Sequence, residues 1–340
     1  MQNELTKPGL EALRRGINES RAARKAIDLA GGYRTHQQAN TFQFVMQSIG
    51  CQQEHCLMCD YGHSEHNLTP DQVATAFDNA LSEAQRPFRN LIVDAFGSVL
   101  DQREVPRPNL DVLLDKIAGV DCRLVTFETH VDTVDDEVLG LIKERLPNKN
   151  IVIELGLETA DEHIRKDHLN KHFTNQKFEQ TVKKIHEHGM IVDANLLVGV
   201  PFLSPKQQLD DLVQSIQYCE EQAVDDIVIF PINIKPETLL WDIHEKGEYT
   251  PVSHWLLIEA LNQLDEPTLQ KIYFAWYGKK QSKIDNLVSI EPTSCSSCRD
   301  DLMGFYESFM LAEAPDKKLM TERLISDRQC DCYDMMMSEL

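Results

Sequence analysis

Short apolar segments alternate with longer amphipathic segments through the middle of the chain. The apolar segments, such as NLIVDAFG and IVIELGLE, are rich in Val, Ile and Leu, which is typical of strands buried on both faces of a parallel sheet. The amphipathic segments carry apolar residues at helical spacing and therefore predict helices. The six predicted strands span residues 41–50, 90–97, 122–129, 151–158, 190–202 and 226–234, and the six helices span 68–84, 109–119, 134–146, 175–189, 205–222 and 253–264.

Strand–helix alternation with short connections predicts right-handed crossovers, and therefore a barrel or a doubly wound sheet. Six units are too few for a closed eightfold barrel, so we predict an α/β fold with an open, TIM-like (βα)6 partial barrel. We expect the barrel over residues 39–268, an N-terminal helical extension at 1–38, and a C-terminal region at 269–340 with a helix at 302–314. Ligands of such folds bind at the C-terminal ends of the strands.

The net charge of −21 bears on the partners of the protein. A nucleic-acid binder normally presents a basic face, because neutralising phosphates supplies most of its non-specific affinity. Only residues 1–36 carry a small basic excess, which we interpret as the solvated face of an amphipathic helix. The charge therefore favours a small-molecule substrate, or one bound to a carrier or peptide, over a nucleic acid.

No apolar run approaches the roughly 18 residues of a membrane-spanning helix. The N-terminal residues MQNELTKPGLEALRRG lack the apolar stretch of a secretory signal. We therefore expect a cytoplasmic protein with no membrane partner.

Nine cysteines are present, and in a cytosolic chain clustered cysteines favour metal or redox chemistry over disulfides. Cys122 and Cys219 stand alone in apolar surroundings, and we expect them to be buried small hydrophobic residues. The other seven form two groups, one near each end of the chain.

The first group lies in GCQQEHCLMCDYGH, residues 50–63, directly after the first predicted strand. Cys51, Cys56 and Cys59 have the spacing C-x4-C-x2-C. Spacing alone leaves two sites open. One is a zinc ion with His55 or His63 as the fourth ligand, and the other is an iron–sulfur cluster with one iron free of protein ligands.

A three-cysteine loop after the first strand of a six-unit barrel resembles the radical S-adenosylmethionine (radical SAM) superfamily. CLMCDYG is similar to the archaeosine-synthase-type branch, and a longer gap like that between Cys51 and Cys56 also occurs in the elongator-catalytic-subunit-like branch. The resemblance implies that Cys51, Cys56 and Cys59 hold a [4Fe-4S] cluster whose fourth iron binds SAM. It also implies an electron donor such as flavodoxin or ferredoxin, and reductive cleavage of SAM to a 5′-deoxyadenosyl radical that abstracts hydrogen from the substrate.

The resemblance continues at the other predicted strand ends, over about residues 40–240. In AFGSVLD, Gly97 and Ser98 stand where the family carries its backbone contact to the methionine amine. In FETHVD, Glu128 matches the family element, but His130 stands in place of its arginine. In ELGLET, Glu158 matches an element near the SAM ribose, and Asn-Lys-His-Phe-Thr at 170–174 matches the stretch that follows it.

The ends of the last two predicted strands, LVGVPFLSP and PINIKPETLL, also resemble archaeosine-type sequences. Asn233 and Thr238 match an Asn-x-x-x-x-Thr pattern there. The resemblance thus implies cofactor binding by Gly97, Ser98, Glu128, Glu158, Asn195 and Asn233, with Glu128 and Glu158 as catalytic residues. The acidic residues Asp94 and Asp193 are further candidates for binding ribose or a cationic group of the substrate.

The second group supplies four thiolates from two separate loops, Cys295, Cys298, Cys330 and Cys332. Four thiolates suit a closed structural zinc site and equally a fully ligated auxiliary iron–sulfur cluster. Either would tie the C-terminal segment to residues near 295 by closing a loop of about thirty residues.

Three functions are consistent with these features. The first, which the charge favours, is a biosynthetic radical SAM enzyme acting on a small or carrier- or peptide-bound metabolite. The second is tRNA-base modification like that of the archaeosine-type relatives, which cleave a lysine adduct on tRNA. The third is a zinc-binding structural or adaptor protein without enzymatic activity, which explains the cysteines but not the motifs at the strand ends.

Overall fold

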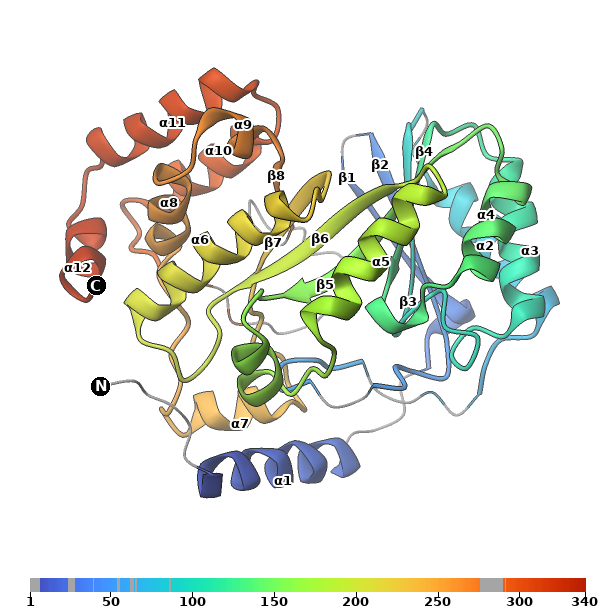
Figure 1. Ribbon diagram of the computed structural model, residues 1–340, viewed down its shortest axis with the longest axis horizontal. Coiled ribbons are helices and arrows are strands. Elements are labelled where there is room, and N and C mark those ends of the chain that lie inside the picture. Colours follow the sequence, from blue (N-terminus) through green and yellow to red (C-terminus); the bar gives the residue numbers. More distant parts are fainter. Residues whose placement is uncertain are drawn as a thin grey trace.

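The structure is a computed structural model that describes residues 7–23, 28–38, 40–53, 56–61, 64, 66–85, 87–275, 290 and 292–340. Its centre is an eight-stranded sheet in which the strands lie in sequence order, from β1 to β8 (Figure 1). The strands are β1 (Tyr33–Gln38), β2 (Thr41–Met46), β3 (Asn90–Ala95), β4 (Leu124–Thr129), β5 (Asn150–Glu158), β6 (Ile191–Val198), β7 (Asp226–Pro231) and β8 (Ile272–Phe274).

Strand β1 pairs antiparallel with β2, and every later pair is parallel. A doubly wound sheet would reverse its strand order at a switch point, whereas the sequential order here is that of a half-barrel. The predicted partial barrel is therefore confirmed, and β2 to β7 are its six predicted strands.

The helices between consecutive strands cover the outer face of the sheet, as Figure 1 shows for α2 to α6. The helices are α1 (Lys7–Ala23), α2 (Pro70–Glu83), α3 (Arg107–Ala118), α4 (Asp136–Arg145), α5 (Asn175–Glu187), α6 (Pro205–Glu221), α7 (Leu239–Glu245), α8 (His254–Asn262), α9 (Glu266–Gln270), α10 (Arg299–Phe309), α11 (Ala314–Ser326) and α12 (Cys332–Ser338). Their starts follow local chemistry: Thr69 caps α2 through a capping box with Gln72, and Pro70 occupies the first turn.

Alternate side chains of each parallel strand point to opposite faces of the sheet. On β3, Leu91, Val93 and Ala95 join the helices in the main hydrophobic core. The residues between them therefore face the inside of the half-barrel, and Asp94 is one of these. On β4 to β7 the same alternation directs every second side chain to the hydrophobic core and the others to the inside of the half-barrel, where the site lies.

A second, smaller core lies beyond the C-terminal ends of the strands. Leu13 and Ile17 of α1 pack there with Leu57 of the cysteine loop and Leu169. Helix α7 completes this core and runs beside α1 along one edge of the molecule in Figure 1. The N-terminal helix therefore supports the loop that carries the first cysteine group.

Two predictions about the elements need correction. The sheet has two strands beyond the six predicted, because β1 is a polar edge strand without an apolar run and β8 is only three residues long. The helix predicted at 302–314 ends at Phe309, because the separate helix α11 begins at Ala314 with Pro315 in its first turn. The division into 1–38, 39–268 and 269–340 stays a prediction, although the sheet extends beyond both ends of its middle range.

None of the helices in the described part of the chain is both long enough and apolar enough to cross a membrane.

The second core yields a prediction about stability. Ile17 is 1% exposed, so Ile17→Ala removes fully buried methylene groups and is expected to lower the free energy of unfolding by about 3 kcal/mol. Because Leu57 shares this core, the thiols of the cysteine loop should also react faster with a thiol reagent. Chemical denaturation and timed thiol labelling measure the two effects, and Asn18→Ala on the exposed face of α1 is the matched control. Equal stability of the two variants would contradict this role of α1.

Candidate functional site

The first cysteine group lies in the loop after β2, at the C-terminal edge of the parallel strands. Cys51, Cys56 and Cys59 are all half-buried free thiols. The loop is fixed by its backbone, since the N–H of Leu57 donates to the carbonyl of Leu169 at 3.0 Å. His55 and His63, the alternative zinc ligands, lie outside the described residues.

Gly97 brings the end of β3 against the cysteine loop. Its φ of +141° disfavours residues with a side chain, and a Cβ there would lie 3.0 Å from the Cα of Cys51. The carboxylate of Glu104 joins the two segments, accepting from the backbone N–H groups of Gln52 (2.6 Å) and Ser98 (2.5 Å). Burial raises the pKa of Glu104 to about 7. Gly97 and Ser98 thus lie beside the cysteine loop, as their predicted role requires.

Two lysines flank the cysteine loop, of which Lys171 is buried and Lys235 is half-buried. Lys171 donates to Glu158 (2.7 Å) and to the carbonyl of Gly156 (2.7 Å), and Lys235 donates to Asp60 (2.6 Å). Burial by itself disfavours the charged ammonium of each lysine. For Lys171, Glu158 and the thiols of Cys56 and Cys51 nevertheless raise the pKa. Asp60 and the thiol of Cys59 do the same for Lys235. Both lysines therefore stay protonated at neutral pH beside the cysteine loop.

His130 lies at the end of β4, where the resemblance expects an arginine. Its Nδ1 accepts the N–H of Asp132 at 3.2 Å, so the proton of the neutral ring is assigned to Nε2. Burial, with the positive charge of Lys171, lowers the pKa of His130 to about 3, so the ring stays neutral. Nε2 is buried and has no hydrogen-bond partner in the described part of the structure. His130 therefore offers an unused N–H donor.

Glu158 ends β5 in a strained conformation. Its φ is +69°, and the pairing of β5 with β6 shifts register between Gly156 and Glu158. Bulges and left-handed non-glycine residues are common at functional sites, where they redirect a side chain. Here the redirected carboxylate meets Lys171. Its predicted ribose contact stays a prediction.

A row of five acidic residues crosses the inner face of the half-barrel. Glu128, Glu154, Asp193 and Asp226 are neighbours in register on β4 to β7. The pairing of Val93 with Phe127 places Asp94 opposite Glu128, so the row begins on β3. We call Asp94, Glu128, Glu154, Asp193 and Asp226 the carboxyl row. It collects Asp94, Glu128 and Asp193, which the sequence proposed separately, and adds Glu154 and Asp226.

The carboxyl row holds protons near neutral pH. Burial is the largest cause in every case and adjacent carboxylates add to it, raising the pKa of Asp94 to about 7, of Glu154 to about 8 and of Asp193 to about 9. The pKa of Glu128 is raised well above its ordinary value for the same reasons. Asp94 and Glu128 hydrogen-bond to each other, and Gln43 donates to Asp94. Glu128 thus belongs to the carboxyl row as well as to the predicted cofactor site.

The two asparagines predicted to bind the cofactor lie on different elements. Asn195 on β6 is 4% exposed and hydrogen-bonds to Glu154, so it adjoins the carboxyl row. Asn233 is half-buried after β7. Thr238, of the same sequence pattern as Asn233, caps α7 by accepting the N–H of Trp241. Thr238 therefore has a structural role in the described part of the chain.

The four cysteines of the second group lie close together in the folded chain. The sulfur atoms of Cys295, Cys298, Cys330 and Cys332 all lie within 4.8 Å of one another. Among the described residues, no other group of three or more His, Cys, Asp or Glu forms a metal-ligating set of this kind. The indole N–H of Trp255 on α8 is buried and interacts with Cys298. The four thiols are thus close enough together to bind one metal ion, and the metal itself stays a prediction.

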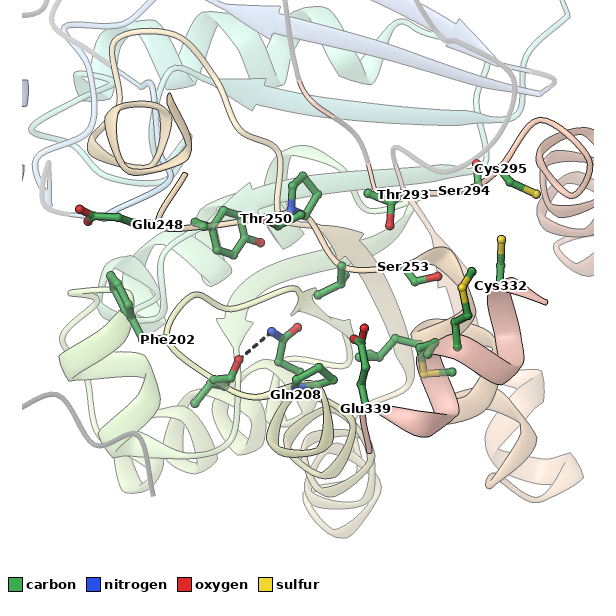
Figure 2. A pocket seen from close by; sticks show the side chains of 18 of the residues that line it. Phe202, Gln208, Glu248, Thr250, Ser253, Thr293, Ser294, Cys295, Cys332 and Glu339 are labelled. Atoms are coloured by element: carbon green, nitrogen blue, oxygen red, sulfur yellow. Dashed lines mark hydrogen bonds between the residues drawn. The ribbon is translucent and has the colours of Figure 1, made fainter. Parts of the chain in front are cut away.

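A cavity of about 1030 Å³ adjoins the second cysteine group. Figure 2 shows Cys295 and Cys332 at one end and Phe202 and Glu248 at the other. Gln208 of α6, whose side chain donates to the carbonyl of Leu203, lies along its wall. None of the residues predicted to bind SAM lines this cavity. The cavity therefore adjoins the second cysteine group and not the predicted SAM site.

Sequence reasoning missed several residues that shape the site. Lys171 and Lys235 lie within the quoted strand-end segments, but a lysine in a loop is normally solvated and gave no signal of its own. Glu104 gave none either, because its role depends on what the fold places beside it. For Glu154 a signal was available, since a carboxylate inside an apolar strand demands a partner.

Comparisons with known proteins agree with the fold. No protein-family model matches the chain. The archaeosine synthase subunit beta of Methanosarcina acetivorans is 28% identical over 333 residues, which cover 94% of this chain and 89% of that protein. The archaeosine synthase subunit beta of Thermococcus kodakarensis is 26% identical over 226 residues, or 64% of this chain and 69% of that protein.

Two solved structures share the fold at a TM-score of 0.51. Methylornithine synthase (PylB) is 14% identical, with 79% of this chain and 71% of that chain covered. The Elp3 protein of Methanocaldococcus infernus is 15% identical, with 72% of this chain and 60% of that chain covered. The half-barrel and the predicted resemblance to archaeosine-type and elongator-like proteins are thereby confirmed.

The carboxyl row makes stability depend on pH. Glu154 binds its proton more tightly in the folded chain than in the unfolded chain, so its contribution to stability is present below about pH 4.5 and is lost as the pH rises through about 8. Glu154→Gln removes this dependence and is expected to stabilise the protein at pH 8 by roughly 2 kcal/mol. Denaturation at a series of pH values measures the difference, with the exposed Glu144→Gln as control. Parallel profiles for wild type and Glu154→Gln would contradict burial of an uncompensated carboxyl.

Proposed function

We propose that this radical SAM enzyme modifies a nucleobase of tRNA in the manner of archaeosine synthase beta subunits. The supporting observation is similarity to one such subunit over 94% of the chain, which includes the barrel. The comparisons thus support the tRNA hypothesis better than the metabolite hypothesis that the net charge favoured. The name of these relatives also suggests a second subunit as a partner for this chain.

The first cysteine group suits a [4Fe-4S] cluster held by Cys51, Cys56 and Cys59. The resemblance at the other strand ends supports a cluster over zinc, since a zinc site would explain the cysteines but not those motifs. Lys171 and Lys235 would offset the negative charge of the thiolates from two sides. When bound, the cluster and SAM supply the radical that removes a hydrogen atom. The protein holds both reactants and excludes water.

The residues around the loop suit the polar groups of SAM. The unused Nε2–H of His130 is a neutral donor for a carboxylate, and it stands where the family has an arginine. Gly97 allows the backbone to approach the cysteine loop closely, which suits the predicted contact with the methionine amine. Lys171 holds the carboxylate of Glu158 at the end of β5, and this carboxylate is a suitable acceptor for ribose hydroxyls.

Helix α1 offers a basic surface close to the cysteine loop. Lys7, Arg14 and Arg15 are exposed, and Arg14 pairs with Asp167 at 3.1 Å, four residues before Lys171. The apolar side of α1 packs with Leu57 of the loop. Phosphates bound to α1 would therefore lie beside the site, which suits an RNA substrate.

The tRNA hypothesis predicts a dependence of SAM cleavage on this surface. With anaerobically reconstituted protein, SAM and a reductant, we expect total tRNA to stimulate 5′-deoxyadenosine formation. The double variant Lys7→Glu/Arg15→Glu should weaken tRNA binding in a filter assay by about tenfold and flatten its salt dependence. Lys183→Glu, a reversal on the exposed surface of α5, is the control and should change neither.

Two outcomes would count against this function. Formation of 5′-deoxyadenosine by the triple variant Cys51→Ala/Cys56→Ala/Cys59→Ala would exclude the first cysteine group as the cluster site. If a free amine-bearing metabolite stimulates 5′-deoxyadenosine formation and tRNA does not, the metabolite hypothesis would be favoured instead.

The second cysteine group suits a single zinc ion rather than an auxiliary cluster. Four sulfur atoms around one zinc at about 2.3 Å stand about 3.8 Å apart. Cys295 and Cys298 have a sulfur–sulfur distance of 3.5 Å, and no pair in the group exceeds 4.8 Å. Thiolates on separate irons of a cubane stand farther apart. The Trp255 N–H would donate to a bound thiolate and stabilise it.

The zinc assignment predicts metal content. Protein with the first group removed by Cys51→Ala/Cys56→Ala/Cys59→Ala should retain about one zinc per chain and no iron. Cys330→Ser/Cys332→Ser should lose that zinc and lower the melting temperature, whereas Cys122→Ala should retain it. Elemental analysis with visible absorption spectra separates zinc from iron. Iron and iron–sulfur absorption in the first-group variant would instead indicate an auxiliary cluster.

A further inference from the structure

The inner face of the half-barrel carries more carboxyl groups than there are positively charged side chains beside them to pair with. The carboxyl row spans five adjacent strands, and Asp94 is 3% exposed and Glu154 8% exposed. Removing carboxylates from water is costly unless they are paired or protonated. Burying this row costs stability, and a binding role for its carboxyl groups would explain that cost.

Three buried oxygen atoms in this region have no hydrogen-bond partner among the described residues. They are Oδ1 of Asp94, Oδ1 of Asp193 and Oδ1 of Asn195. Asp193 and Asn195 are two positions apart on β6, and Glu154 pairs with Asp193 on the adjacent strand β5. The side-chain amide of Asn195 donates to Glu154. The side-chain oxygen of Asn195 is therefore left as an acceptor. Glu154, Asp193 and Asn195 are thus neighbouring acceptors on two adjacent strands, and we call them the acceptor group.

The positive groups around the row lie at its edges. Arg34 of β1 lies in register beyond Asp94 and stacks on Phe96, and Lys171 is held by Glu158 at the strand ends. Asp226, at the other end of the row, is close to Lys271 and Lys317. The acceptor group lies between these edges.

A metal ion is a poor match for the carboxyl row. The compact group of metal-ligating atoms in the described structure is the second cysteine group, and the row contributes no such group. Oxygen acceptors spread over adjacent strands suit a larger cation that binds through hydrogen bonds. An ammonium group offers three N–H donors, whereas a guanidinium requires acceptors arranged in one plane.

We propose that Glu154, Asp193 and Asn195 bind a protonated aliphatic amine of the substrate. The proposal rests on the proposed function, because a lysine adduct on a nucleobase carries an amine that is protonated at neutral pH. Glu154 lies four residues before Glu158 on β5, which places it about 13 Å below the strand end. An amine held there directs the rest of the substrate toward the cysteine loop.

Calorimetry of the reconstituted enzyme with SAM tests the site. The probe is n-butylammonium, with 1-butanol as its neutral match. We expect the amine to bind with a dissociation constant on the order of 1 mM and the alcohol not to bind measurably. Because the row holds protons near pH 7, binding should release protons, so the observed enthalpy should differ between buffers of different ionisation enthalpy.

Matched variants locate the binding. Glu154→Gln and Asp193→Asn should each weaken amine binding at least tenfold, and Asp226→Asn, in the same row but beside lysines, should not. The exposed Glu144→Gln should cleave SAM slowly without substrate at the wild-type rate, and circular dichroism checks that every variant is folded. Wild-type protein that does not bind the amine, or equal binding by all variants, would overturn the proposal. If no protein cleaves SAM, the proposed function is refuted, and the calorimetric binding data alone then decide whether the amine site exists.

Discussion

Lys171 links the parts of the site, and their arrangement depends on its charge. Its ammonium group is held by the carboxylate of Glu158 and the carbonyl of Gly156, and it faces the thiols of Cys51 and Cys56. Gly156 leaves room for it, since a Cβ there would lie 2.5 Å from the lysine nitrogen. A buried cation is stable only when such acceptors surround it. The requirement to pair Lys171 therefore fixes the end of β5 relative to the cysteine loop.

The two cysteine groups differ in what surrounds them. The first lies on one loop at the open ends of the strands, between two lysines, which suits a redox cofactor that must also bind SAM. The second joins residues near 295 to the start of α12 and packs against α8. Its four sulfurs close around one point, which suits a structural ion. Chemistry and stabilisation of the C-terminal helices are thus assigned to separate sites.

The formal charge of −21 is a weak guide to the substrate, because it counts every carboxyl group as an exposed anion. In the folded chain Asp94, Glu154 and Asp193 lie inside the half-barrel, and burial raises the pKa of each. The exposed basic residues of α1, by contrast, lie next to the cysteine loop. An average over the chain cannot distinguish an acidic interior from an acidic surface. The same carboxyl groups that suggested a metabolite are compatible with an RNA whose modified base carries an amine.

The sequence alone determined the strand–helix alternation, the six parallel strands and the two cysteine groups, because these depend on local periodicity and spacing. Its motifs also named Gly97, Ser98, Glu128 and Glu158, which strand ends bring to one edge. Only the tertiary structure decided the partners of Lys171 and Lys235, the unused donor of His130 and the carboxyl row. Each of these depends on strand register or on segments distant in sequence, as with Lys235 and Asp60, which lie 175 residues apart. Local patterns specify the elements, whereas long-range pairing specifies which charges meet.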